Sequence, residues 1–251
     1  VAARLGEVEV EIEMLVVGTH DVEETRCVRA DFLAQLAQRI RAEGGEHEQP
    51  PGCQHAAQLG EHRPEVHAPL QHQVGENEIE TGIPFTGRAG KELMKSLASI
   101  GLSREDVYIT SSVRSRPFKW GTKKERDGTL VKRTYNRAPK APEILAHAPL
   151  LDYEIKHVQP RLIVTLGTIG LQRLLGKQAK VTELHGQKLE KSIQYLKTLD
   201  DEVYSWTQED YSIVPTFHPA SIFYRPSLRD LLELDWQKIG EYLKEINDKK
   251  S

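Results

Sequence analysis

The sequence contains little cysteine and no long apolar run. Its two cysteines, Cys27 and Cys53, stand too far apart to form a CxxC pair, which argues against a disulfide framework or a cysteine-based metal knuckle. No stretch approaches the roughly 18 consecutive apolar residues of a membrane span, and the start lacks a basic region followed by an apolar segment. We therefore expect a soluble cytoplasmic protein of 251 residues, with one substantial core or one core and a small appendage.

Charge and residue type change near residue 80. Residues 1–80 contain 6 Arg, no Lys and 16 acidic residues, a net charge of -10, whereas residues 81–251 contain 28 basic and 21 acidic residues, a net charge of +7. The first part also lacks Tyr and Trp and holds six of the ten histidines. A basic body is suited to approach phosphates, although surface lysines alone would give the same balance.

The same boundary divides the predicted structure. Residues 43–73 are a run of Gly, His, Glu, Gln and Pro without apolar periodicity, which predicts loop or disorder. Before them, residues 8–17 are predicted to form a strand and residues 32–40 a short amphipathic helix. We predict a non-homologous or poorly ordered segment over 1–74, a domain over 75–246 and a tail over 247–251.

Helix and strand patterns alternate from Thr81 onward, as in an α/β domain. The patterns predict helices over 93–100, 144–158 (bent or broken at Pro149), 171–175 and 228–246, and strands over 107–110, 161–166 and 212–217. An insert over 118–135 is predicted to form a basic hairpin that turns at Asp127 and Gly128. Strands separated by helices predict a sheet covered on both faces, with a ligand site beyond the carboxyl ends of its strands.

Unusual residues gather at those carboxyl ends, in GIPFTGRAG, ITSSVRSRP, VTLGTIG and PTFHPASIF. Each segment alone is a weak signal, since the GTIG turn lacks dinucleotide-binding spacing and a histidine before proline is usually a turn residue. Together with NRAP, PEILAHAPLL and QPRLIVTLG, they resemble the uracil-DNA glycosylase superfamily, and most closely its family 4. The resemblance covers about 170 residues. It implies a three-layer α/β/α fold around a parallel four-stranded sheet, and an enzyme that removes uracil from DNA without cofactor redox chemistry. We expect this chain to be a monomer without a cofactor.

The resemblance also implies roles for individual residues. The target base must leave the stack, so the enzyme needs a pocket for a flipped uracil. Phe85 matches the phenylalanine that stacks on the pyrimidine, although a plain core role stays open. His218 matches the histidine that stabilises the negative charge on the departing uracil. Ile222 stands where the family carries a leucine wedge for the minor groove. The residues expected to contact DNA are Arg116, Gly167, Ser221, Ile222 and Arg225.

The first departure from the family concerns metal. Family 4 members bind an iron-sulfur cluster through four cysteines, but two of those positions hold Ser115 and His147 here. We therefore predict no cluster and no other metal. The basic hairpin is expected to brace that region or to contact DNA, with a merely solvated hairpin as the alternative.

The second departure concerns the reading of the base. The family usually has an asparagine where this chain has Ser111, and a hydroxyl cannot make both amide contacts at once. Discrimination against cytosine would then be weaker or would rest on backbone groups. Uracil is the expected base, with hypoxanthine and xanthine as extensions.

The third departure is the loss of the family's first strand and its GE(A/G)PG loop, whose acidic residue positions the attacking water. Gly75 and Glu78 are candidate remnants of that loop. The segment MLVVGTHD at 14–21 resembles the missing strand and turn but lies about sixty residues too early. Either it supplies the strand through a long insertion, or residues 1–74 derive from a fusion or a shifted reading frame.

Two functional classes follow. The first is a uracil-DNA glycosylase of base-excision repair, with His218 and Glu78 as catalytic residues and Phe85, Ser111 and Gly75 as substrate-binding residues. The second is a DNA-binding homologue without turnover, because its water-positioning loop is missing. A nucleotide-binding α/β protein is disfavoured, since the sequence has neither a P-loop nor a dinucleotide fingerprint.

Overall fold

The computed structural model describes residues 14–17, 87–113, 117–125 and 127–248. Its centre is a five-stranded sheet in the order β2-β1-β5-β9-β6. The strands are β1 (Met14–Val17), β2 (Tyr108–Thr110), β5 (Leu162–Leu166), β6 (Leu189–Lys191) and β9 (Tyr211–Thr216). The strand predictions near 107–110, 161–166 and 212–217 are therefore confirmed. Two further short strands, β7 (Gln194–Tyr195) and β8 (Ser205–Trp206), pair separately.

The sheet is mixed, not the parallel four-stranded sheet that the sequence predicts. β5 and β9 are parallel, whereas β1 runs antiparallel to both of its neighbours, β2 and β5. The edge strand β6 is antiparallel to β9. Because β1 opposes both β2 and β5, the strands β2, β5 and β9 point the same way. Their carboxyl ends meet at one edge of the sheet, as the α/β prediction requires.

The strand at residues 14–17 does enter the sheet, but in the reverse direction. Met14 pairs with Thr110 and Thr165 at the carboxyl ends of β2 and β5, and Val17 pairs with Leu162 at the start of β5. The chain therefore leaves β1 at the edge of the sheet opposite the predicted site. The segment MLVV thus supplies a strand of the sheet, but an antiparallel one, unlike the strands of the parallel sheet that the family resemblance implies.

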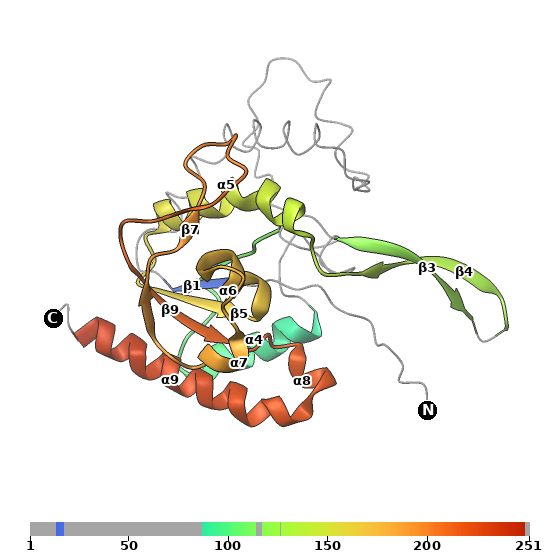
Figure 1. Cartoon of the computed structure of the whole chain (residues 1–251). Helices are drawn as coiled ribbons and strands as arrows, with labels where there is room; N and C mark the ends of the chain where they lie inside the picture. The colour runs from blue at the N-terminus through green and yellow to red at the C-terminus, as the bar shows by residue number, and fades with distance from the viewer. Residues whose placement is uncertain (1–13, 18–86, 114–116, 126, 249–251) are drawn as a thin grey trace, which may run out of the picture.

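Helices cover both faces of this sheet (Figure 1). They are α4 (Arg88–Ser99), α5 (Ala141–Val158), α6 (Thr168–Leu175), α7 (Val181–Leu184), α8 (Ser221–Tyr224) and α9 (Arg229–Asp248), with a short 3-10 helix η2 at Pro226–Leu228. α5 runs without interruption through Pro149, so the predicted break is not seen. None of the helices in the described part of the chain is long and apolar enough to cross a membrane.

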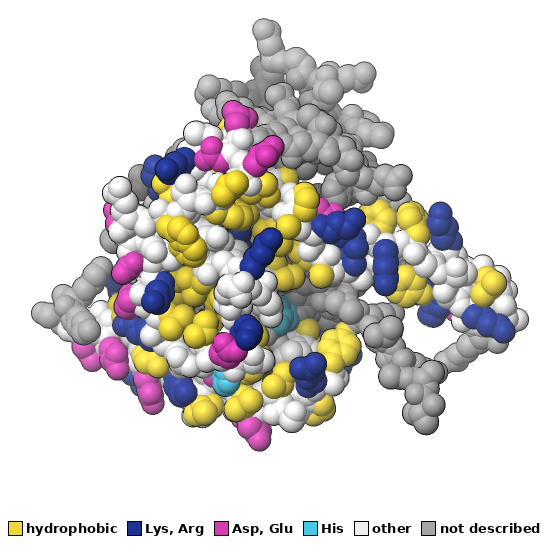
Figure 2. All heavy atoms as spheres, viewed as in Figure 1, with side chains coloured by type: hydrophobic (Ala, Val, Ile, Leu, Met, Phe, Trp, Pro, Cys, Tyr) yellow, Lys and Arg dark blue, Asp and Glu magenta, His cyan; other side chains and the backbone are white. Residues whose placement is uncertain are grey.

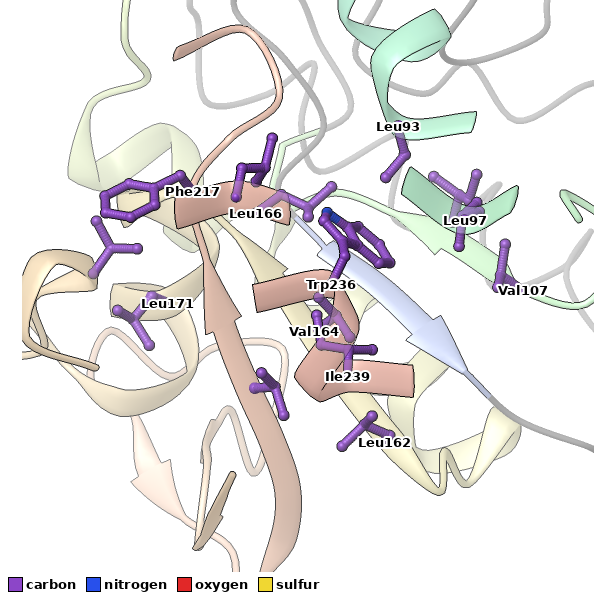
Figure 3. Close-up of a cluster of buried hydrophobic side chains, with 14 of the residues drawn as sticks. Leu93, Leu97, Val107, Leu162, Val164, Leu166, Leu171, Phe217, Trp236 and Ile239 are labelled. Carbon is purple, nitrogen blue, oxygen red and sulfur yellow. The ribbon is translucent and has the colours of Figure 1, made fainter. Parts of the chain in front are cut away.

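The core lies on both faces of the sheet because β5 alternates between them. Leu162, Val164 and Leu166 join the cluster that α4 and α9 cover, whereas Ile163 joins the cluster beneath α5. Figure 3 shows the first cluster, with Trp236 of α9 lying between the sheet and α4. Trp236 is 1% exposed. Such a two-sided apolar sheet is the three-layer α/β/α arrangement that the sequence predicts.

The predicted insert forms a two-stranded ribbon of β3 (Phe118–Lys124) and β4 (Leu130–Asn136), which projects from the body (Figure 1). Its turn closes with hydrogen bonds from Glu125 N to Thr129 O at 2.9 Å and from Gly128 N to Glu125 O at 3.1 Å. Gly128 has a φ of 90°, which suits glycine. The hairpin prediction is therefore confirmed. The boundary at Gly75, the loop over 43–73 and the helix over 32–40 lie outside the described residues.

The position of β1 between two strands gives a direct test of its role. Leu15→Pro removes a backbone N–H from a strand that pairs on both sides, with Ile109 and Val164. We expect a loss of about 1–3 kcal/mol in the free energy of unfolding, measured by urea titration. Leu15→Ala, which keeps the N–H, is the control for the change of side chain. Equal stability of the proline variant and the wild type would mean that the domain folds without β1.

Candidate active site

His218 follows β9 at the edge where the parallel strands end. The ring is half-buried, and its Nδ1 accepts a hydrogen bond from the backbone N–H of Ala220 at 3.0 Å. A ring nitrogen that accepts carries no proton, so a neutral His218 holds its proton on Nε2. The turn is closed further by a bond from Ser221 N to His218 O at 2.9 Å. The local backbone thus selects the tautomer that presents Nε2–H as a donor.

Gly167 brings the end of β5 against His218. Its N–H donates to Thr216 O at 2.8 Å, and its φ of 88° is one that side-chain-bearing residues rarely adopt. A Cβ added at this position would lie 3.1 Å from the Cβ of His218. Glycine here therefore permits both the turn into α6 and the close approach of the histidine.

Gly167→Ala should impair both stability and catalysis. We expect a loss of about 1–3 kcal/mol in unfolding free energy from backbone strain, with a slower single-turnover reaction because the new methyl group displaces His218. Gly101→Ala is a matched control, since Gly101 also has a positive φ, of 77°, but an added Cβ meets nothing within 4 Å. A Gly167→Ala protein that loses stability as the control does but reacts at the wild-type rate would show that the contact with His218 has no catalytic role.

A buried carboxylate fixes the end of β9 from the side of α9. Asp235 is 0% exposed and accepts hydrogen bonds from Thr216 Oγ1 at 2.7 Å and from His185 Nδ1 at 2.9 Å. The His185 ring in turn contacts the Phe217 ring, with centroids 4.6 Å apart. These contacts fix the positions of Thr216 and Phe217, the two residues that precede His218. The sequence did carry a signal for this support, an acidic residue on the apolar face of the last helix, between Leu232 and Ile239.

The start of α4 lies beside the segment that follows His218, at the same edge of the sheet. The guanidinium of Arg88 lies 4.3 Å from the centroid of the Phe223 ring, which belongs to the segment after His218. Arg229 Nη1 and Glu92 Oε2 join the two segments again at 3.6 Å. Arg88 and the N-cap residue Gly87 directly follow the GIPF segment in the chain. The structure therefore brings the GRAG and HPAS motifs together, as the sequence predicts for the four segments.

Ser111 directly follows β2, at the same edge of the sheet. It is 1% exposed, and its hydroxyl donates to Val113 O at 2.7 Å while accepting from Val113 N at 3.2 Å. Its single O–H is thus already used. The preceding residues of β2 are fixed to α5, since Glu154 accepts from Tyr108 Oη at 2.8 Å and Thr110 Oγ1 at 2.5 Å. Among described residues the buried hydroxyl of Ser112 has no hydrogen-bond partner, and sequence reasoning did not single it out.

The segment after His218 offers polar atoms at its two ends. The Ser221 hydroxyl is buried and makes no hydrogen bond with the part of the chain described. Arg225 is exposed just beyond α8. Ile222 is only 3% exposed and packs in the core, whereas Tyr224 is 53% exposed. In this conformation a wedge role for Ile222 therefore requires the segment to move, and it stays a prediction.

Four predicted site residues lie outside the described part of the chain. They are the candidate loop residues Gly75 and Glu78, the stacking residue Phe85 and the DNA contact Arg116. Their roles stay predictions from the sequence.

The available ligands do not fit a four-cysteine iron-sulfur cluster. The whole chain has two cysteines, and His147, at one of the family's ligand positions, is a 5% exposed residue of α5. Across the described ranges, no group of three or more His, Cys, Asp and Glu side chains is arranged to hold a metal ion.

Purified protein should accordingly be colourless and contain no stoichiometric iron. Iron analysis and a visible absorption spectrum test this expectation. About four iron atoms per chain would contradict it and would place thiolate ligands where this sequence has none.

Comparisons with known proteins agree with this geometry. A family model described as the uracil DNA glycosylase superfamily matches residues 71–246. A type-4 uracil-DNA glycosylase of Saccharolobus solfataricus is 36% identical over 172 residues, which cover 67% of this chain and 67% of that protein. Proteins of the same name from Sulfurisphaera tokodaii and Archaeoglobus fulgidus are 33% and 34% identical, covering 66% of this chain in both cases, and 65% and 71% of the relatives. The chain therefore belongs to the uracil DNA glycosylase superfamily.

Proposed function

We propose that this protein is a uracil-DNA glycosylase that hydrolyses the N-glycosidic bond of uracil flipped out of DNA, as the first step of base-excision repair. The observation that carries the proposal is the bond from Ala220 N–H to His218 Nδ1, which leaves the proton of the neutral ring on Nε2. The type-4 uracil-DNA glycosylases among its relatives support the same substrate class.

The reaction breaks the bond between N1 of uracil and C1′ of the sugar. Both electrons of that bond go to the base, so negative charge develops on the uracil oxygens while the sugar becomes an oxocarbenium ion. A preorganised Nε2–H donor at the uracil O2 stabilises that charge more in the transition state than in the ground state. A water molecule then supplies the hydroxyl group on C1′ and releases one proton, which leaves an abasic site and free uracil.

The surroundings of His218 support this role for it. Its ring is held by the turn to Ala220 and by the close approach of Gly167, so the donor needs little reorganisation when charge develops. Phe85 is proposed as the stacking floor for uracil and Glu78 as the residue that positions the water. Gly167, Ser221, Arg225 and Arg116 are proposed contacts to the flanking DNA, with Ser111 at the base edge.

A second candidate is a DNA-binding homologue without turnover. It is favoured by one observation, the reversed direction of β1. The last residue of β1, Val17, pairs with Leu162 at the start of β5, so β1 ends at the far edge of the sheet from Gly167. If Glu78 does not position water, nothing else among the proposed site residues would do so.

A cleavage assay decides between the two candidates. Single-stranded and duplex oligonucleotides that contain one uracil are incubated with the protein, and alkali then breaks the strand at abasic sites. Cleavage that requires the uracil supports the glycosylase. Tight binding of the same DNA without strand breaks, at any enzyme concentration, would support the non-catalytic homologue.

A further inference from the structure

The projecting ribbon of β3 and β4 carries a concentration of positive charge. Residues 118–136 contain six Lys or Arg and two acidic residues, a net charge of +4. Figure 2 shows Lys and Arg side chains spaced along the ribbon, interleaved with hydrophobic ones. Three of these hydrophobic side chains are well exposed, namely Trp120 at 48%, Leu130 at 68% and Val131 at 38%. Exposed aromatic and cationic side chains together form the kind of surface that nucleic acids bind.

The strand register assigns these residues to two faces. Trp120 pairs with Thr134, Thr122 with Lys132, and Lys124 with Leu130, so these side chains share one face, which we call the Trp120 face. On this face the Nζ of Lys132 lies 4.4 Å from the centroid of the Trp120 ring. An indole and two lysines thus lie within one short strip.

The opposite face, which we call the Tyr135 face, carries Lys119, Lys123, Val131, Arg133 and Tyr135. Its aromatic ring is not presented in the same way. Tyr135 is half-buried and lies across the strand at Gly121, where an added Cβ would come within 2.7 Å of its ring. Lys123 is also 3.9 Å from the carboxylate of Glu125. The two faces have similar charge, but of their two aromatic rings Trp120 is exposed and Tyr135 is half-buried.

The base of the ribbon is fixed to the body near the site. Arg137 Nε donates to Phe118 O at 3.0 Å, and Arg137 N donates to Pro117 O at 3.1 Å. The same guanidinium binds both carboxylate oxygens of Glu143 at the start of α5, at 2.8 Å and 2.5 Å. The ribbon begins at Phe118, five residues after Val113, and Val113 is bonded to Ser111 at the carboxyl end of β2. The base of the ribbon is therefore anchored at the same edge of the sheet as the candidate active site.

We propose that the Trp120 face binds a single-stranded segment of DNA next to the target nucleotide. Trp120 stacks on an unpaired base, and Lys124 and Lys132 neutralise phosphates of the same strand. The inference rests on the proposed function, in which DNA is the substrate. We choose an unpaired strand because stacking needs a base whose flat face is accessible to the indole. In duplex DNA these faces are covered by the neighbouring bases, whereas in a single strand they can be reached. A strand of seven residues spans roughly 20 Å, enough for several nucleotides.

The stacking contact can be tested without catalysis by using a uracil-free oligothymidylate of about 30 nucleotides. Its binding to the protein is measured by fluorescence anisotropy. We expect Trp120→Ala to raise the Kd about tenfold. Trp206→Ala is the matched control, because Trp206 is equally exposed, at 50%, but lies on β8. The two substitutions should change the thermal midpoint by similar, small amounts, since about half of each tryptophan is exposed.

The salt dependence of the same binding tests the two faces. Lys124→Gln with Lys132→Gln should reduce the slope of log K against log salt by about 1.4, that is about 0.7 for each lost phosphate contact with single-stranded DNA. Lys119→Gln with Lys123→Gln removes the same charge from the Tyr135 face and should change the slope much less. Equal reductions by the two pairs would contradict the assignment to the Trp120 face.

The ribbon proposal and the proposed function fail in different ways. Equal oligothymidylate binding by Trp120→Ala and Trp206→Ala would overturn the ribbon proposal, as would a loss of binding that appears only with duplex DNA. Wild-type protein that cleaves uracil-containing DNA would leave the proposed function intact in either case. Conversely, a tenfold loss for Trp120→Ala in a protein that never cleaves would support the ribbon and refute the glycosylase.

Discussion

His218→Ala is expected to lower the single-turnover rate of uracil release by about 10² to 10³, the range for losing one preorganised donor. DNA affinity should stay nearly unchanged, because the contact strengthens only as charge develops on the base. Rapid-quench measurements at saturating enzyme give the rate, and anisotropy with uracil-containing DNA gives the affinity.

The control for this variant is His157→Ala, which removes an exposed histidine of α5 that stacks on Tyr153 with ring centroids 3.8 Å apart. It should react at the wild-type rate. If His218 only caps the turn that ends β9, its loss should instead lower the thermal midpoint and every activity in proportion. A folded His218→Ala protein that releases uracil as fast as the wild type would remove His218 from the mechanism.

Arg173→Met should give the largest loss of stability, about 3–5 kcal/mol at neutral pH, because it breaks a buried ion pair. The Arg173 side chain is 0% exposed and contacts the carboxylate of Asp152 in α5. It also donates to Gln194 O at 2.8 Å and lies 4.5 Å from the Tyr204 ring centroid. Without the guanidinium, Asp152 keeps the hydrogen bond that its other oxygen, Oδ2, accepts from the N–H of Leu196 at 3.0 Å.

The stability deficit of Arg173→Met should depend on pH. Burial raises the pKa of Asp152 above its ordinary value of 3.8, and Arg173 opposes this rise. Removing Arg173 therefore raises the folded-state pKa further while the unfolded-state pKa is unchanged. A carboxyl group with a raised folded pKa favours the folded state at low pH, and this contribution is lost as pH rises through the folded pKa. The deficit should be smaller near pH 5 than near pH 8, and urea unfolding titrations at the two pH values measure the difference.

Two comparisons isolate the ion pair. Asp152→Asn added to Arg173→Met removes the unpaired charge and should restore most of the lost stability. Lys180→Met breaks an exposed pair, in which Nζ of Lys180 lies 2.8 Å from Glu183 Oε1, and should leave the unfolding midpoint unchanged within error. A deficit that is the same at both pH values and survives Asp152→Asn would mean that lost packing, not charge, explains the effect.

Much of the fold could be predicted because its elements carry strong periodic patterns. The stripe of Leu232, Ile239 and their neighbours predicts α9, and the run before Gly167 predicts β5. Family motifs located His218 and Gly167, which the structure brings into contact. The short strands between residues 189 and 206 were missed, because two or three residues are too few to show an alternation.

Other features could not be predicted for physical reasons. The four residues of β1 are apolar in either direction, so their pattern does not say whether the strand is parallel or antiparallel. The pairing of Asp235 with His185 joins residues 50 positions apart, and only the three-dimensional fold brings them together. The burial of Ile222 likewise depends on how the segment after His218 packs against the core, not on its place in a motif.

The middle position of β1 has a consequence for how the molecule forms. Its residues are separated from Tyr108 of β2 by roughly 90 positions, and closing a flexible loop of that length costs about 4 kcal/mol in chain entropy before any pairing compensates. During synthesis β1 leaves the ribosome long before β2 and β5, the two strands that flank it. It must therefore wait as an unpaired apolar segment until they emerge, and the five-stranded sheet is completed only when β9, its last strand in the chain, has left the ribosome.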